Sequence, residues 1–240
     1  MNSQVDRRDE LAHNLEQTRE RIRAAAVDAG RRPEDVALTV VTKFFPASDV
    51  MLLADLGVTD VGENRHQEAE TKHATCVAEG LGGLRWHFIG GLQSNKAAAV
   101  ARYADVVESV DRAKLVAPLA RGAAESGRVV DVLVQVSLDD PESTGARSGV
   151  DPGQVEALAE TVAAQDSLRL RGVMAVAPLG ADPVPAFERL AGVAARVRAV
   201  EAAATWISAG MSGDLEAAVR SGATHVRIGS AILGMRPPIK

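Results

Sequence analysis

VALTVVTKFFP, residues 36–46, is the stretch from which the fold can be worked out. Every residue from 36 to 42 is Val, Ala, Leu or Thr, and such a continuous apolar, β-branched run is typical of a strand buried on both faces. Strands of this kind belong to parallel sheets that are covered on both sides. One cation, Lys43, ends the run, and two phenylalanines and a proline follow it. We therefore expect a central strand with a lysine at its carboxyl end.

Strand and helix patterns alternate along the rest of the chain. The expected strands cover 36–43, 58–64, 84–90, 104–110, 128–137, 168–177, 205–211 and 225–233. This alternation predicts parallel strands joined by crossover helices. Eight such units in about 200 residues favour a closed (β/α)₈ barrel of the TIM type. The alternative is an open doubly wound sheet, but no glycine-rich turn of the dinucleotide-binding kind follows the first strand.

One further helix precedes the first strand. Residues 6–29 read as an amphipathic helix whose apolar positions recur at helical spacing: Leu11, Leu15, Ile22 and Ala26. We expect a single α/β domain over residues 1–240, in which residues 1–35 form this helix and a lead-in. The one long connection, 137–150, is rich in Gly, Pro, Ser and Asp and is a candidate lid.

Composition limits the classes of function. The chain has 240 residues, of which 46% are hydrophobic and 25% charged, as in a globular protein with a full-sized core. A net charge of −5 gives no support for a nucleic acid or an anionic membrane as partner. The single cysteine, Cys76, and the scattered histidines predict no disulfide framework and no metal site. The charged N-terminus lacks a signal-peptide core, so we expect a cytoplasmic protein, and we expect a monomer.

Lys43 is the first candidate for chemistry. An ammonium group among apolar neighbours is costly, so burial favours the neutral amine, which is a nucleophile for aldehydes. The carboxyl ends of the strands form the active face of a barrel, and Lys43 would lie there. The alternative is a lysine that extends its charge into solvent at a strand end.

The last two strands end in segments that suit a phosphate group. Residues 210–214 and 228–234 each combine glycine with a serine, Ser212 or Ser230, which we expect to open a helix. Barrels often bind phosphate at this position through helix N-termini. Ordinary helix capping by the two serines is the alternative. Alternation also turns Arg227 toward the barrel interior, where an arginine requires an anion; a surface ion pair is its alternative.

The barrel mouth thus combines a lysine that can form an imine with a phosphate cradle, the segments 210–214 and 228–234. Together they indicate a phosphorylated aldehyde as ligand. Pyridoxal 5′-phosphate meets both requirements. A sugar phosphate in an aldolase that uses a lysine Schiff base meets them too, so both remain open at this point.

The sequence resembles the pyridoxal phosphate homeostasis protein family, whose members have a fold similar to the N-terminal barrel of alanine racemase. The resemblance extends from about residue 36 to about residue 234. It rests on VTKFFP (41–46), VGENRHQE (61–68), WHFIGGLQSNK (86–96), VLVQVS (132–137), SGV (148–150), GVMAVAP (172–178), SAGMSGDLEAAV (208–219) and THVRIGSAILG (224–234).

The resemblance implies a set of cofactor-binding residues. Lys43 matches the lysine that holds pyridoxal phosphate as an internal aldimine, and Arg227 matches an arginine near the pyridine ring and the phosphate. The other positions implied to bind the cofactor are Asn64, Met211, Ser212, Gly229 and Ser230. Three departures from the family pattern are Gly91 in place of histidine or another polar residue, Ser230 in place of threonine, and Phe44 and Phe45 where polar residues are often found.

The resemblance also implies a carrier that holds the cofactor and regulates its intracellular level, without an established catalytic reaction. Pyridoxal phosphate-dependent apoenzymes would be its recipients. Racemisation needs a base on each face of the substrate. In racemases that resemble this fold the second base is a tyrosine, and the only tyrosine here, Tyr103, is expected at the end of the barrel away from the site. The alternatives are a weak racemase or Schiff-base lyase of the alanine racemase type, and a barrel with no ligand.

Overall fold

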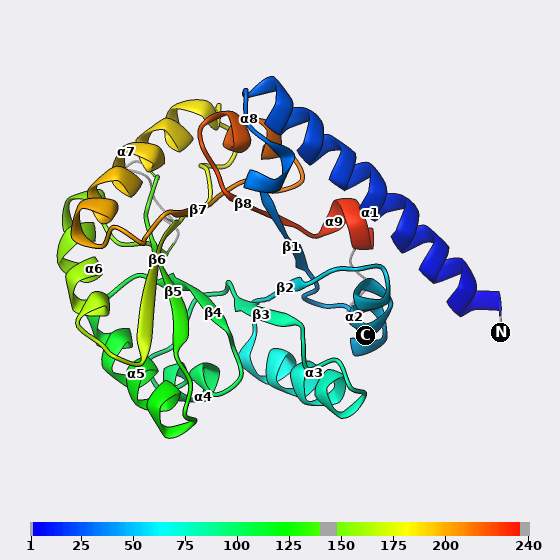
Figure 1. Cartoon of the computed structure of the whole chain (residues 1–240), viewed down its shortest axis with the longest axis horizontal. Coiled ribbons are helices and arrows are strands. Elements are labelled where there is room, and N and C mark those ends of the chain that lie inside the picture. Colours follow the sequence, from blue (N-terminus) through cyan, green and yellow to red (C-terminus); the bar gives the residue numbers. More distant parts are fainter. Residues whose placement is uncertain (1, 140–147, 236–240) are drawn as a thin grey trace.

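The computed structural model describes residues 2–139 and 148–235 and shows a closed barrel of eight parallel strands in chain order, with helices on the outside (Figure 1). This confirms the predicted (β/α)₈ architecture. The strands are β1 (Ala37–Val41), β2 (Asp60–Glu63), β3 (Arg85–Phe88), β4 (Val106–Val110), β5 (Val130–Gln135), β6 (Leu168–Met174), β7 (Trp206–Ser208) and β8 (His225–Ile228). Strand β8 closes the barrel by pairing with β1, with Ala37 opposite His225 and Val40 opposite Ile228.

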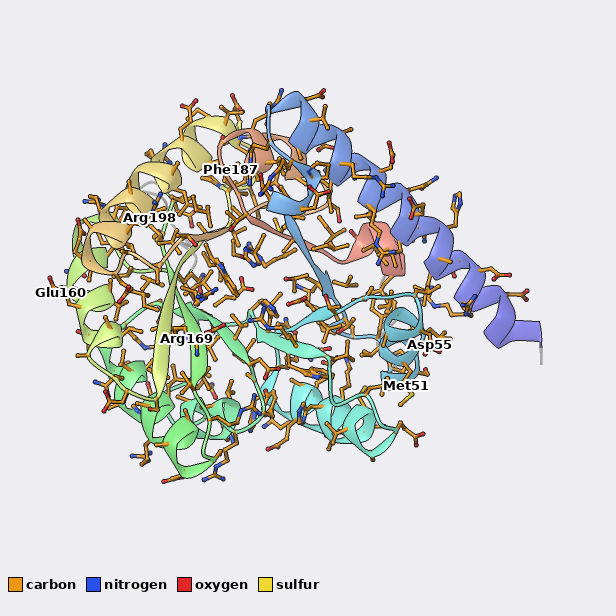
Figure 2. The ribbon with its side chains drawn as sticks, in the orientation of Figure 1. Met51, Asp55, Glu160, Arg169, Phe187 and Arg198 are labelled. Carbon is orange, nitrogen blue, oxygen red and sulfur yellow. The ribbon has the colours of Figure 1, made fainter. Side chains whose placement is uncertain are left out.

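The helices form an outer ring that covers the barrel. They are α1 (Asn2–Asp28), α2 (Ala47–Asp55), α3 (His66–Ala78), α4 (Ala97–Ala101), α5 (Val116–Glu125), α6 (Val155–Ala163), α7 (Val184–Val200), α8 (Leu215–Arg220) and α9 (Ser230–Leu233), with 3₁₀ turns at Pro33–Asp35, Ala113–Leu115 and Pro152–Gln154. Each longer helix buries one stripe and exposes the other. In α6, for example, Leu158 and Val162 are buried, whereas Glu160 lies on the outer face, as Arg198 does on α7 (Figure 2).

The strands are shorter than their apolar runs. The run at 36–43 yields a strand over Ala37–Val41, so Lys43 lies just beyond the strand. Pairing continues to the Thr42 N–H, which donates to Gly62 O at 3.0 Å. An apolar run indicates buried residues, and the buried residues continue past the last strand residue into the loop at the barrel mouth.

Helix α1 is the N-terminal addition to the barrel. Its predicted apolar residues Leu11, Leu15, Ile22 and Ala26 are all buried. Figure 1 shows α1, in dark blue, along the outside of the barrel beside α8 and α9. The Asn14 side chain donates to Ile232 O at 3.0 Å and thereby ties α1 to α9.

The apolar core lies between the barrel and the helices, while the barrel interior is largely polar. Two large clusters of buried residues fill the space under the helices, and a small one, Val106, Leu133 and Met174, lies apart from them. Within the described ranges, no helix is both long and apolar enough to cross a bilayer. The loop predicted as a lid, 137–150, includes residues 140–147, which lie outside the described residues.

Candidate functional site

A cavity of about 500 Å³ opens at the carboxyl ends of the strands. All seven residues singled out from the sequence line it: Lys43, Asn64, Met211, Ser212, Arg227, Gly229 and Ser230. These residues come from the ends of β1, β2, β7 and β8, so the closed strand order brings together parts of the chain that are far apart in sequence. The remaining wall is mostly apolar and includes Phe44 and Phe45.

The lysine side of the cavity lies close to the end of β8. A Cβ atom added at Gly229 would lie 3.1 Å from Val41 O, so glycine allows the β8 end to approach the β1 end closely. Lys43 is half-buried and follows the fully paired part of β1. Phe44 has a φ of 71°, an uncommon value for a bulky residue, which marks a sharp change of chain direction directly after the lysine.

The loops after β7 and β8 meet across the cavity. Ser230 Oγ donates to Ser212 Oγ at 3.3 Å, and the Ala231 N–H donates to the same Ser212 oxygen at 3.4 Å. The expectation that Ser212 opens the helix after β7 is wrong. Helix α8 begins at Leu215, and Asp214 precedes it and accepts the Met211 N–H at 2.6 Å. Ser212 instead contacts the first turn of α9, which places its hydroxyl beside Ser230.

Arg227 lies inside the barrel, as the alternation of β8 predicts, so a surface ion pair is excluded. The residue is 4% exposed, and its side chain donates to Ser208 Oγ at 2.7 Å and to Ala175 O at 2.8 Å. Glu108 Oε2 lies 3.9 Å from the guanidinium. Burial lowers the pKa of Arg227, and the charge of Glu108 opposes this effect.

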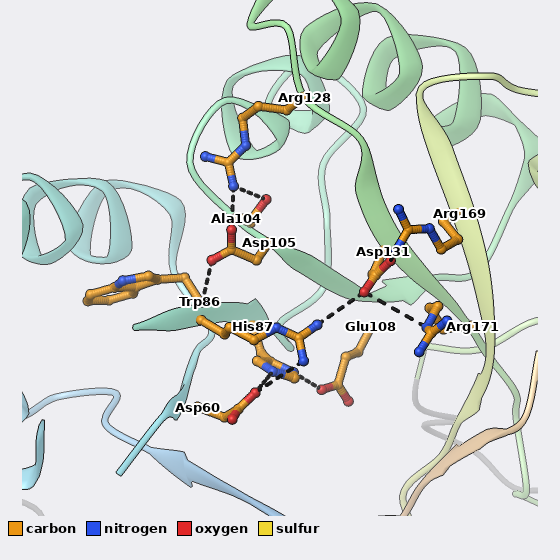
Figure 3. Close-up of polar contacts among 11 residues, drawn as sticks. Asp60, Trp86, His87, Ala104, Asp105, Glu108, Arg128, Asp131, Arg169 and Arg171 are labelled. Atoms are coloured by element: carbon orange, nitrogen blue, oxygen red, sulfur yellow. Dashed lines mark hydrogen bonds and ion pairs between the residues drawn. The ribbon is translucent and has the colours of Figure 1, made fainter. Parts of the chain in front are cut away.

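A buried ionic network continues from Glu108 down the barrel axis (Figure 3). The His87 ring is hydrogen-bonded through Nδ1 to Glu108 at 2.7 Å and through Nε2 to Asp60 at 2.9 Å. Burial alone would lower the pKa of His87, but the two carboxylates outweigh burial and raise it to about 9. Burial would raise the pKa of Glu108, but His87 and Arg227 lower it to about 2. A chain of charges therefore reaches from mid-barrel to the cavity floor.

His225 lies at the end of the barrel away from the cavity, and its pKa changes in the direction opposite to that of His87. Its ring lies 4.2 Å from the Trp206 ring, and burial lowers its pKa to about 4. It is therefore neutral at neutral pH. Trp206 also lies under the guanidinium groups of Arg85 and Arg171, both of which approach Asp131. Figure 3 shows Arg169 and Arg171 beside Asp131. Together with the Arg85–Asp131 pair, these contacts close this end of the barrel with ion pairs.

Several residues of the site were not singled out from the sequence. The cavity wall also includes Ile89, Gly90, Gln135, Met174 and Val176. Glu108 supports Arg227 and could have been found, because it is a lone carboxylate inside the apolar run VVESV. Tyr103, considered as a second base, stacks instead on His66 with ring centroids 5.9 Å apart.

This architecture is also found in known proteins. The profile described as alanine racemase, N-terminal domain, matches residues 7–237. A similar fold is found in alanine racemase from Corynebacterium glutamicum, with a TM-score of 0.64 and 19% identity over 97% of this chain and 63% of that chain. The protein is thus a barrel of the alanine racemase N-terminal class.

Two closer relatives define the family. The pyridoxal phosphate homeostasis protein of Mycobacterium tuberculosis H37Rv is 43% identical over 96% of this chain and 95% of its own length. PipY of Synechococcus elongatus, whose structure was determined with pyridoxal phosphate bound, has a TM-score of 0.80 and 32% identity over 93% of this chain and all of that chain. The chain belongs to the pyridoxal phosphate homeostasis protein family, as its motifs indicate.

Proposed function

We propose that this protein binds pyridoxal 5′-phosphate through Lys43 and regulates its free intracellular level. The observation that carries the proposal is the charge of the cavity. Among the lining residues that the structure describes, the titratable side chains are Lys43 and Arg227, and none is a carboxylate. Such a cavity suits an anionic ligand, and an amine at its edge suits an aldehyde.

The remaining groups of the cavity fit the same ligand. The two serine hydroxyls, Ser212 and Ser230, lie side by side and can donate to a phosphate group. A Cβ atom added at Gly213 would meet nothing within 4 Å, so there is space beside them. The Asn64 side-chain oxygen is buried and has no hydrogen-bond partner within the described ranges, so it can accept from a hydroxyl group of the ligand. A volume of about 500 Å³ is in the usual range for a cofactor site.

When bound, pyridoxal phosphate supplies an aldehyde that condenses with a primary amine and releases water. Lys43 would provide that amine. Ser212, Gly229 and Ser230 would hold the phosphate, with Met211 and Asn64 as further contacts. Arg227 would face the ring, held in its charged form by Glu108 and in position by Ser208.

The residues favour binding and release over turnover of a substrate. Racemisation and related reactions require a proton donor or acceptor on each face of the reacting carbon. In the described part of the cavity wall, Lys43 is the one side chain that can exchange a proton in that role, because Arg227 stays protonated. A guanidinium cation next to the ring nitrogen would also disfavour protonation of that nitrogen, which makes the ring a weaker electron sink.

The test compares the wild type with Lys43→Ala and with a matched control, Lys114→Ala, whose lysine is exposed on the loop after β4. Wild type and Lys114→Ala should gain a visible absorbance band with added pyridoxal phosphate, and Lys43→Ala should not. A wild type that stays colourless would refute the proposal. Exchange of an amino acid's α-hydrogen in deuterated water, catalysed by the loaded protein, would instead indicate a racemase or lyase.

A further inference from the structure

Lys72, on α3, is a buried cation outside the cavity. It is 6% exposed, and its ammonium group donates three hydrogen bonds, to Glu63 Oε1 at 2.7 Å, Glu68 Oε1 at 2.8 Å and Thr42 O at 2.8 Å. A buried charge is stable only when it is paired and hydrogen-bonded. Buried ion pairs of this kind can often be replaced by apolar residues without loss of stability, so stability alone does not account for the cluster.

The cluster holds the peptide groups on both sides of Lys43. The carbonyl that precedes the lysine, Thr42 O, accepts from Lys72. The amide that follows it, Phe44 N–H, donates to Glu68 Oε1 at 2.6 Å. That carboxylate oxygen is the one that accepts from Lys72. The backbone of Lys43 is therefore fixed at two points by a single ionic group.

The anchored segment is also strained. Phe44 has a φ of 71°, a left-handed conformation that side chains with a Cβ rarely adopt. Such a conformation persists only when the surrounding structure enforces it, and functional sites are where it tends to occur. The hydrogen bond from Phe44 N–H to Glu68 enforces it here. Thr42 Oγ1 adds a further restraint by donating to Glu63 Oε1 at 2.7 Å.

We infer that Lys72 and Glu68 are positioning residues that fix Lys43 for covalent attachment of the cofactor; the inference rests on the proposed function. The phosphate cradle lies on the loops after β7 and β8, whereas the cluster lies on α3 and β2. Attachment requires the neutral amine nitrogen to bond to the aldehyde carbon of a ligand held by its phosphate; the two amine protons then leave with the aldehyde oxygen as water. Loosening of the Lys43 backbone therefore slows attachment and leaves recognition of the phosphate unchanged.

The test uses two ligands on the full-length protein. Pyridoxine 5′-phosphate carries an alcohol in place of the aldehyde, and its equilibrium affinity reports the cavity and the cradle. Pyridoxal 5′-phosphate, trapped with borohydride and mapped by mass spectrometry, reports the rate of attachment to Lys43. The variants are Lys72→Met, Glu68→Ala and Glu68→Gln, where the glutamine keeps an oxygen that can accept from Phe44 N–H. Glu70→Ala, on the exposed face of α3, is the matched control.

Lys72→Met and Glu68→Ala should lower the attachment rate by about tenfold to a hundredfold, because small misplacements of a reacting group have effects of that size. Their affinity for pyridoxine 5′-phosphate should match that of the wild type. Glu68→Gln should restore most of the attachment rate, and Glu70→Ala should not change it. A folded Glu68→Ala with the wild-type attachment rate would overturn the inference while the proposed function stands. A wild type that binds neither ligand would overturn both.

Discussion

His87 should determine how the stability of this protein falls at alkaline pH. Its ring is buried between Asp60 and Glu108, which raise its pKa from 6.5 to about 9 in the folded state despite burial. A folded-state pKa above the unfolded value stabilises the fold fully below the unfolded pKa. This contribution is complete below pH 6.5 and is lost as the pH rises through about 9.

The size of the effect follows from the shift. One pKa unit corresponds to about 1.4 kcal/mol, so the rise from 6.5 to about 9 amounts to about 3 kcal/mol of unfolding free energy. No correction for solvent screening is needed, because the His87 side chain is buried. A loss of this size is a large fraction of the stability of a typical domain.

Urea unfolding of the cofactor-free protein, followed by circular dichroism from about pH 6 to about pH 10, measures this loss. The wild type should lose about 3 kcal/mol over that range. His87→Gln should be less stable at neutral pH but should lack this dependence. His13→Gln, at an exposed position of α1, should keep the wild-type curve. A flat wild-type curve, or equal slopes for the wild type and His87→Gln, would show that His87 does not determine the alkaline loss of stability.

Three further substitutions test other parts of the structure. Ser212→Ala should weaken binding of pyridoxine 5′-phosphate about tenfold, because a hydrogen bond to a charged group is lost; unchanged affinity in calorimetry would remove this serine from the phosphate site. Gly90→Ala should destabilise the protein by about 1–3 kcal/mol, because the new Cβ would lie 2.1 Å from the Asn64 backbone oxygen. Gly213→Ala, where a Cβ meets nothing within 4 Å, is its control in urea unfolding, and equal midpoints for the two variants would contradict the packing argument. Burial lowers the pKa of His225 to about 4, so the stability of the protein should fall as the pH drops from 6.5 toward 4. His225→Gln should remove this pH dependence in urea unfolding. An unchanged dependence in the variant would show that another group titrates there.

The architecture and part of the cavity wall could be predicted from the sequence for a physical reason. In a parallel barrel every strand packs against the covering helices, so each one leaves buried apolar residues between two helical segments, and the eight strand segments can be counted. Function gathers at the carboxyl ends of the strands, so the residue after each run is a candidate for the site. Lys43 was found in this way, Asn64 was implied by the family resemblance, and both line the cavity.

The contacts that support the site could not be predicted from the sequence, because the separation of two elements along the chain does not give their distance in space. In the sequence Lys72 is one of several charged residues on a helix, yet its side chain donates a hydrogen bond to the carbonyl of Thr42. Glu108 and His87 lie on neighbouring strands and face the same interior, but nothing in either strand indicates the partner. Ser212 was expected to open the helix after β7, but that helix begins at Leu215, and the Ser212 hydroxyl contacts the first turn of α9 instead.

Covalent attachment of pyridoxal phosphate to Lys43 can be tested directly. Protein purified from growing cells, reduced with borohydride without added cofactor and digested, can be searched by mass spectrometry for a pyridoxyl phosphate adduct on each lysine. The adduct is expected on Lys43, with Lys72, Lys96 and Lys114 unmodified. A protein without any adduct, or with the adduct on another lysine while Lys43 stays unmodified, would contradict it.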